Sequence, residues 1–413
     1  MRNRRMAELT RLANGVTVAI DQVEGAQSAS IGLYAAVGSR SEVDGKGGLA
    51  HLVEHMVFKG ARGRDARGIA EAIEDVGGSL NAWTARDQTV FHARILAPDV
   101  GLGLELIADL VRAPRLDPDE LEREKLVILS ELGECLDAPD DLIHDYLFEA
   151  AYGDQPVARP VLGREASINA ITRDDCTTWL ADQYRPERLV ISAAGKIDPG
   201  HILNLAESLF GDLVSAPPPP IAPATFEGGV RQDKRAAEQT HLAFAYRGLA
   251  SDDPATPALA LFAQAVGGGM SSRLFQQLRE DRGLAYSIYA WTQGFAETGL
   301  FGVNLSTDKA RAAEALALAR DCVAQAADDL TEAELNRARA QFEAGLLMSL
   351  ETPQGRADSI ARSIEIFGRI VSLDEMLAEL RSVDAAAARA AGQAMLSGPR
   401  ATAGIGGKIA LAA

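Results

Sequence analysis

The chain has 413 residues, 47% of them hydrophobic and 24% charged, which is typical of a soluble globular protein and long enough for two domains. Its formal net charge of −17 argues against nucleic acid as a partner, because binding to phosphates needs a basic patch. No apolar run approaches the roughly 20 residues that cross a bilayer, so we expect no membrane partner.

The N-terminal segment, residues 1–15, is basic but lacks the apolar stretch of a secretory signal. The three cysteines are widely separated, so they form neither a disulfide framework nor a cysteine-rich zinc site; they are Cys135, Cys176 and Cys322. Free thiols of this kind are typical of a reducing compartment. We therefore expect a cytoplasmic protein.

The first half of the chain begins with strand patterns and continues with helices. In chain order the patterns predict two strands, two helices, a strand region rich in Thr, Val, Phe and Ile, and two more helices. These lie at Gly15–Asp21, Ala29–Val37, Leu49–Phe58, Gly68–Val76, Asn81–Leu96, Val100–Val111 and Pro118–Cys135.

The second half repeats this order loosely. A strand, two helices, two strands and two long helices are predicted at Thr240–Arg247, Ala255–Val266, Ser271–Arg279, Tyr286–Thr292, Gly299–Ser306, Ala310–Ala327 and Thr331–Leu350. Two halves of similar element order indicate a duplicated domain. The repeat lies in the pattern of elements and not in the residues.

A proline-rich stretch near the middle of the chain separates the halves. It contains five prolines and favours an extended spacer, because proline continues neither a helix nor an interior strand. We therefore predict a first domain at 1–213, a linker at 214–225 and a second domain at 226–413. The fold class is α+β, with two related domains that each contain a mostly antiparallel sheet with helices packed on one side.

His51, Glu54 and His55 form an H-x-x-E-H motif within a helix pattern. Side chains four residues apart on a helix share one face, so both imidazoles can reach one metal ion. Two imidazoles and one carboxylate suit Zn²⁺ and leave a position for water, and a carboxylate that is not a ligand then takes a proton from that water. The motif predicts His51 and His55 as ligands and Glu54 as the catalytic base.

The third ligand is expected in the helix that Asp117 and Pro118 open. Its apolar stripe contains Glu124 and Glu131, and buried carboxylates are normally paired or bound to metal. We assign Glu131 as the third ligand and Glu124 as the partner that orients a histidine. Glu134 is the main rival ligand, and the two acids could also reach solvent at the edge of the stripe.

The segments Gly38–Glu42 and Gly48–Gly60 together resemble the signature of the pitrilysin/insulinase family of zinc peptidases, closest to the branch of mitochondrial processing peptidase and its bacterial relatives. In that family the third ligand follows the second motif histidine by about 75 residues, and here 131 − 55 = 76. The family also has a glutamate seven residues before that ligand, which matches Glu124. The segment Gly77–Thr84, with Asn81 and Ala82, resembles the family's edge strand that pairs with the substrate backbone.

Two segments of the second half, Gly267–Leu274 and Leu278–Tyr286, resemble the family's other signature. The resemblance implies that Arg279 and Tyr286 bind substrate. Without it, the three glycines are a tight turn and Arg279 is a solvated helix residue. A nucleotide phosphate loop is excluded because the Lys-Ser/Thr pair is missing.

The resemblance further implies a half-clamshell that dimerises to enclose a chamber. We expect a zinc endopeptidase that cleaves short unstructured peptides or presequences, acting as a homodimer, with a hetero-partner left open. Two alternatives compete: a structural subunit of a larger complex, against which the intact metal motif argues, and a zinc hydrolase of a non-peptide substrate, against which the edge-strand motif argues.

Overall fold

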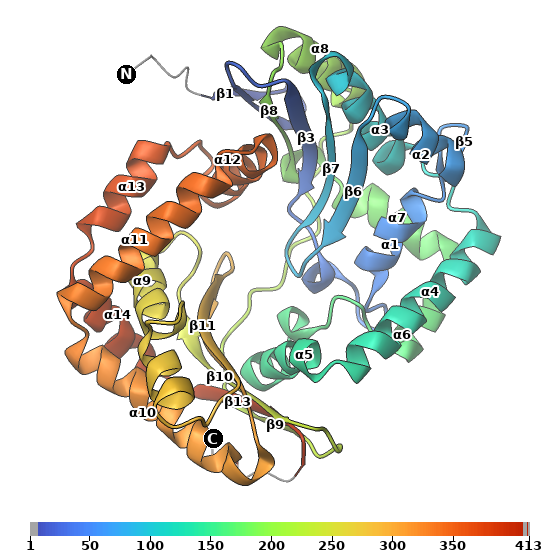
Figure 1. The fold of residues 1–413 in the computed structure, drawn as a ribbon. Coiled ribbons are helices and arrows are strands. Elements are labelled where there is room, and N and C mark those ends of the chain that lie inside the picture. The colour runs from blue at the N-terminus through green and yellow to red at the C-terminus, as the bar shows by residue number, and fades with distance from the viewer. Residues whose placement is uncertain (1–6, 408–410, 412–413) are drawn as a thin grey trace. The chain divides into compact units, whose positions relative to one another are not determined.

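The computed structural model describes residues 7–407 and 411, and their contacts divide the chain into two compact units (Figure 1). The first unit extends to Gly133 and adds Pro160–Ala222 and Leu347–Ser372. The second unit contains Glu134–Arg159, Pro223–Leu346 and the segment from Leu373 onward. Each unit therefore includes a segment from the other half of the chain, which the predicted contiguous domains did not anticipate.

The first unit is built on a six-stranded sheet in the order β1-β2-β8-β3-β7-β6. All neighbouring strands are antiparallel except β2 and β8, which are parallel. The strands are β1 (Glu8–Arg11), β2 (Thr17–Gln22), β3 (Ser28–Ala35), β6 (Ser79–Thr84), β7 (Thr89–Leu96) and β8 (Leu189–Gly195). A short ribbon of β4 (Gly60–Ala61) and β5 (Arg64–Asp65) lies outside this sheet.

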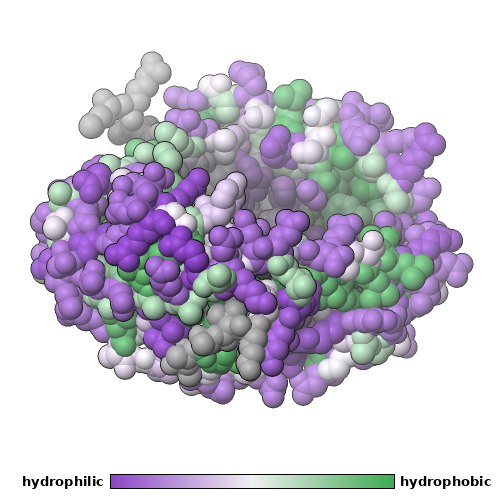
Figure 2. Space-filling view, turned by 60° about the horizontal axis from the view of Figure 1, so that its bottom comes forward, coloured by the Kyte–Doolittle hydropathy of each residue, from purple (hydrophilic) through white to green (hydrophobic). Residues whose placement is uncertain are grey.

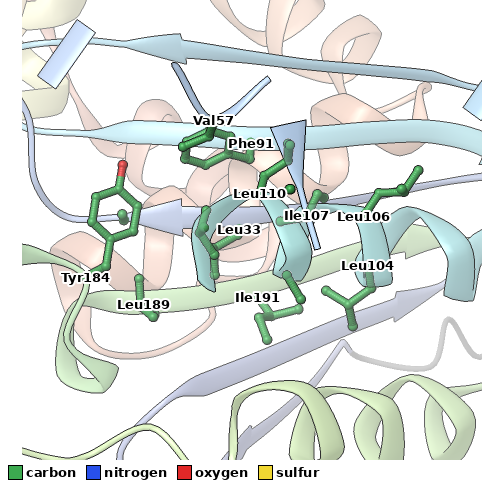
Figure 3. Close-up of a cluster of buried hydrophobic side chains, with 14 of the residues drawn as sticks. Leu33, Val57, Phe91, Leu104, Leu106, Ile107, Leu110, Tyr184, Leu189 and Ile191 are labelled. Atoms are coloured by element: carbon green, nitrogen blue, oxygen red, sulfur yellow. The ribbon is translucent and has the colours of Figure 1, made fainter. Parts of the chain in front are cut away.

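Helices bury one face of this sheet in a continuous apolar core. Figure 3 shows part of it, where leucines of α3 pack against Leu33 and Phe91 from the sheet and Tyr184 closes one side. The first half of the chain contributes to this unit the helices α1 (Leu49–Val57), α2 (Ala66–Glu74), α3 (Val100–Arg112), most of α4 (Pro118–Asp137), α6 (Glu165–Ala170), α7 (Arg173–Gln183) and α8 (Pro199–Phe210).

The second unit repeats this plan with a five-stranded sheet in the order β11-β12-β10-β13-β9. Its strands are β9 (Gly229–Asp233), β10 (Thr240–Gly248), β11 (Ser287–Gly294), β12 (Gly299–Thr307) and β13 (Arg400–Ile405). Its helices include α9 (Thr256–Gly267), a π-helix at Phe275–Glu280, α10 (Ala312–Asp329), most of α11 (Glu332–Ser349), α13 (Leu373–Ser382) and α14 (Ala385–Leu396). The α+β class with mostly antiparallel sheets is confirmed.

The two halves of the chain exchange one helix each. Helix α5 (Pro139–Tyr152), from the first half, packs on β13, β10 and β9 of the second unit. Helix α12 (Pro353–Phe367), from the second half, packs on β8, β3 and β2 of the first unit. In Figure 1 the orange α12 lies beside the blue and green strands of the first sheet. Each exchanged helix covers the sheet face opposite to the main core, which adds a second layer of helix to the predicted plan.

The two exchanged helices dock through both apolar and polar contacts. Helix α5 buries a row of apolar side chains against its sheet, including Leu147, Phe148 and Tyr152. Helix α12 adds polar contacts: Ser30 Oγ donates to Gln354 Oε1 over 2.5 Å, and Tyr34 Oη donates to Asp358 Oδ1 over 2.5 Å. Helix α5 also has polar contacts with its sheet, since Glu149 pairs with Arg231 over 2.9 Å and Asp140 lies 2.7 Å from His241, so charge contributes to the docking of both helices.

Strand β6 forms one free edge of the first sheet, and β11 occupies the equivalent edge of the second. Residues 79–84 read Ser-Leu-Asn-Ala-Trp-Thr and residues 287–292 read Ser-Ile-Tyr-Ala-Trp-Thr. The duplication thus survives in residues at this edge, and the expectation that it lies in pattern alone was wrong. The single strand region predicted at Asn81–Leu96 is a hairpin, because the chain turns between Thr84 and Thr89.

The exterior of the molecule is mixed in hydropathy. The face in Figure 2 is covered mainly by hydrophilic residues, with smaller hydrophobic patches between them. In the part of the chain that the structure describes, no helix combines the length and the apolar composition that a membrane crossing requires.

Candidate metal centre

The H-x-x-E-H motif lies on α1, where local sequence fixes both the start and the rotation of the helix. Gly48 precedes it with φ of 90°, a left-handed conformation that glycine adopts without strain. The Glu42 carboxylate accepts hydrogen bonds from the amides of Gly48 and Ala50 at 3.1 and 2.8 Å, so an acid caps the positive end of the helix. Glu42 was not among the residues predicted to have a role at the site.

Apolar packing turns the motif residues toward one side. The side chains of Leu52, Val53, Met56 and Val57 are buried in the core, whereas His51, Glu54 and His55 are half-buried. Burial of the apolar face therefore leaves the three polar side chains together at the core's edge.

Helix α4 brings Glu131 to the two histidines. Oε2 of Glu131 lies 3.9 Å from Nε2 of His51 and 3.8 Å from Nε2 of His55. Donors at tetrahedral zinc, with bonds of about 2.0–2.2 Å, lie about 3.4 Å apart, so small shifts would close this set around one ion. Among the described residues these three make up the one group of potential metal donors, and the rival Glu134 is not part of it.

Glu124 contacts the His55 ring nitrogen that faces away from Glu131 and so orients the ring. Its Oε2 lies 3.1 Å from His55 Nδ1, and its Oε1 lies 2.8 Å from Lys59 Nζ. A histidine that donates from Nδ1 to a carboxylate keeps Nε2 free for a metal, which is the usual arrangement around metal-binding histidines. The residues present therefore fit a zinc ion. Lys59 was not singled out in the sequence analysis, although it follows His55 by one helical turn.

Burial sets the protonation of the motif. Burial, and then the charge of His55, lowers the pKa of His51 to about 4, so the imidazole is neutral and able to bind metal. Burial raises the pKa of Glu54, while the Thr84 hydrogen bond and His55 oppose the rise and Glu131 adds to it. Glu54 is thus a carboxylate with increased proton affinity, which suits a base.

Glu54 is held from the edge strand and the core. The Thr84 hydroxyl on β6 donates to Glu54 Oε2 over 2.5 Å. Burial raises the pKa of Tyr184 far above its ordinary value, and the Glu54 charge adds to the rise, so the phenol stays neutral beside the carboxylate. Thr84 could have been predicted as a neighbour of the motif from strand alternation, because it lies two residues beyond Ala82 on the same face. Nothing in the sequence connects Tyr184 to the motif.

Asn81 and Ala82 lie on β6, at the free edge of the sheet. The Ala82 amide donates to the side-chain Oδ1 of Asn81 over 2.9 Å. This backbone donor is therefore satisfied by an exposed side chain of its neighbour.

Arg279 and Tyr286 belong to the second unit and not to the unit that contains the histidines. The guanidinium carbon of Arg279 lies 5.8 Å from the ring centre of Tyr286 and 4.8 Å from that of Phe275. Tyr286 is 71% exposed. The pair is close enough to act together, and its role toward substrate stays a prediction.

Two family descriptions match the chain. "Insulinase (Peptidase family M16)" matches residues 17–165, the segment that contains His51, Glu54, His55 and Glu131. "Peptidase M16 inactive domain" matches residues 170–342.

Curated relatives match over nearly the whole chain. An uncharacterized zinc protease of Streptomyces coelicolor is 35% identical over 384 residues, covering 91% of this chain and 84% of the relative. One of Mycobacterium tuberculosis is 35% identical and covers 94% and 90% of the two chains. The uncharacterized zinc protease YmxG of Bacillus subtilis is 31% identical and covers 90% and 91%.

Solved structures share the fold. The structure described as a peptidase M16 inactive domain of Pseudomonas fluorescens has a TM-score of 0.89 at 23% identity and covers 99% of both chains. A protease of Helicobacter pylori has a TM-score of 0.89 at 20% identity, covering 97% of this chain and 99% of its own.

Proposed function

The chain belongs to the insulinase family of peptidases, M16, and from this premise we propose that it is a zinc-dependent endopeptidase. One observation carries the proposal: donor atoms of His51, His55 and Glu131 lie within 4.8 Å of one another, and Glu54 lies beside them without being one of the donors. Three protein ligands leave one position of a tetrahedral ion open, as catalytic zinc sites require.

The residues divide the work as follows. Zinc held by His51, His55 and Glu131 would lower the pKa of a bound water to near 7 and polarise the scissile carbonyl. Glu54 accepts a proton from the attacking water and passes it to the leaving amine. Glu124 keeps His55 in the orientation that its Nδ1 contact fixes.

The substrate is proposed to be an extended peptide that adds a strand to β6. Support comes from the free edge and from the Ala82 amide, whose bond to Asn81 Oδ1 a substrate carbonyl can replace. Main-chain hydrogen bonds of this kind give affinity with little side-chain selectivity. Short unstructured peptides and presequences fit this mode, and a mitochondrial-processing-peptidase-like role is part of the proposal.

The remaining parts of the proposal rest on the family resemblance. Arg279 and Tyr286 bind the substrate carbonyl, two copies of the chain form a homodimer, and a closed chamber excludes folded proteins. A cytoplasmic setting also belongs here; it is supported by Cys135, Cys176 and Cys322, which are all free thiols.

A non-catalytic structural subunit is the competing function. The description "inactive domain" matches residues 170–342, and the proposed metal donors and base all lie outside that range. A structural role has no use for a complete donor set together with an oriented base, so we favour the peptidase.

Digestion of a peptide library with product mapping by mass spectrometry tests the function. Cleavage is expected with zinc bound, and it should disappear with a chelator and in Glu54→Gln. An unfolded polypeptide should be cut and its folded form should not. A complete absence of cleavage by zinc-loaded protein, or equal cleavage by Glu54→Gln, would overturn the proposal.

The dimer is tested by mixing two defects. Glu54→Gln and Arg279→Ala should each be nearly inactive alone. If the second unit of one copy completes the site of the other, half of randomly paired dimers are mixed and each has one intact site, so roughly a quarter of the activity returns on co-expression. No recovery, with mixed dimers demonstrated, contradicts completion across the dimer and leaves the zinc assignment intact.

A further inference from the structure

The contact between Thr84 and Glu54 joins the substrate-binding edge to the base. No other hydrogen bond reaches the Glu54 carboxylate from the residues that the structure describes, and the Thr84 hydroxyl donates to Oε2 over 2.5 Å. We propose that Thr84 is a positioning residue, which holds Oε2 so that Oε1 of Glu54 faces the attacking water. The inference rests on the proposed function and deepens it.

The Glu54 carboxylate needs a hydrogen bond that fixes its orientation, because it lies next to the proposed metal ligands. Glu54 precedes His55 on the same helix and lies close enough to Glu131 for the charges to interact. A glutamate has three rotatable side-chain bonds, and a free carboxylate beside two imidazoles can turn toward the metal and compete with Glu131 as a ligand. A hydrogen bond to one oxygen removes this freedom and leaves the second oxygen for the proton.

Thr84 is itself held rigidly. Its β-branched side chain has restricted rotation, and it pairs with Thr89 across the β6–β7 hairpin. The Thr89 hydroxyl donates to the Val37 carbonyl over 2.9 Å, and the Ala85 amide donates to the Gln88 carbonyl over 2.7 Å, which closes the turn. The end of the hairpin is therefore fixed on both strands.

The same strand offers its edge to the peptide. Leu80 and Ala82 pack against the core that α1 helps to form, and Thr84 follows at the same two-residue spacing, so its side chain lies on that face. Within the described part of the chain, the backbone of β6 has no neighbouring strand on its outer side. The strand that binds the substrate backbone thus also sets the orientation of the base.

Thr84→Val tests the inference, because valine keeps the shape of threonine and removes the hydroxyl. With a short fluorescence-quenched peptide as substrate, kcat should fall about 10- to 100-fold, the range expected for losing a hydrogen bond to a charged group. KM and zinc content should not change. Thr84→Ser, which keeps the hydroxyl, should restore kcat to within about 3-fold of the wild type.

A matched control is available in the second unit. Thr292 ends the same Ala-Trp-Thr sequence on β11, and its hydroxyl makes no hydrogen bond within the described part of the chain. Thr292→Val should leave kcat unchanged, which separates loss of the Glu54 contact from a general effect of valine in an edge strand.

Each outcome decides the inference. The inference about Thr84 is overturned if zinc-loaded Thr84→Val has wild-type kcat, if only its KM changes, or if Thr84→Ser does not restore kcat. In each of these cases, an inactive Glu54→Gln variant still supports the proposed function. Substantial activity of Glu54→Gln would show that Glu54 is not the base, and would overturn both the proposed function and this inference. If Thr84→Val does not fold, Thr84→Ala is judged by the same criteria.

Discussion

Strands β6 and β11 are equivalent edge strands of the two sheets, but only β6 lies beside the residues proposed to be catalytic. Both begin Ser-x-x-Ala-Trp-Thr, and both pair antiparallel with the next strand of their sheets. Helix α1 lies against β6 and carries two histidines and a glutamate, whereas α9 lies against β11 and carries neither a histidine nor an acid. Duplication preserved the scaffold, and the proposed chemistry depends on a few polar side chains of the helix that packs against one copy of the strand.

The largest expected effect lies at Glu54, the residue that most separates the two edges. Glu54→Gln should lower turnover by about 10³-fold, within the range for loss of a general base, and should keep about one zinc per chain because it removes no ligand. Turnover of the peptide and metal content by atomic absorption measure the two effects. A variant that loses its zinc would show that Glu54 is a ligand.

The next effect concerns the third ligand and compares two acids on one helix. Glu131→Gln should weaken zinc binding by more than about 100-fold, since loss of an outer partner alone costs 10–100-fold. Glu134→Gln, on the same helix but outside the donor group, is the matched control and should bind zinc as the wild type does. Competition with a chromophoric chelator gives both constants, and equal weakening in the two variants would contradict the assignment.

A smaller effect should appear in stability, at the polar docking of α12. Burial raises the pKa of Glu365 to about 7; Arg362 opposes the rise and Asp87 adds to it. A carboxyl whose pKa is higher in the folded than in the unfolded state contributes its full stabilisation of the fold below the unfolded pKa, near 4.5. That stabilisation is lost as the pH rises through the folded pKa, about 7. The Glu365→Gln variant keeps a hydrogen-bond acceptor for Gln88. Its free energy of unfolding relative to the wild type should be higher at pH 8 than at pH 4.5, by up to about 3 kcal/mol.

Thermal or urea unfolding of the variant and the wild type across pH 4.5–8 measures this difference. Glu379→Gln is the control for a charge-removing substitution, because Glu379 is exposed on α13. If Glu365→Gln and the wild type differ equally at every pH, the Glu365 carboxyl titrates alike in the folded and unfolded states, and the docking of α12 is not charge-sensitive there.

The residues of the proposed centre could be predicted from the sequence because local patterns specify them. The spacing of His51 and His55 on one helix and the position of Glu131 on an apolar stripe specify side-chain directions, and the structure brings the three together. Glu124 beside His55 follows from the same stripe. The two-residue period of a strand also contained Thr84, although its partner became evident only with α1 and β6 side by side.

The exchange of α5 and α12 could not be predicted in the same way. The apolar face of a helix indicates that it is covered but not which sheet covers it. The residue-level match of the edge strands was missed for a related reason, since a six-residue similarity gains meaning only when both segments occupy the same place in a sheet. The roles of Arg279 and Tyr286 stay predictions, because they concern a substrate.

The exchanged helices also impose an order on biogenesis. The strands and core helices of the first unit all leave the ribosome before Ala222, but the helix that covers its second face is made only when synthesis reaches Phe367. Domains usually fold as they emerge, N-terminal first, and here the nascent first unit must wait with one face of its sheet uncovered for more than a hundred residues of further synthesis. Two fragments made by a cut between Leu213 and Thr225 would each hold a helix that the other requires, so we expect a nicked chain to stay together until it is denatured.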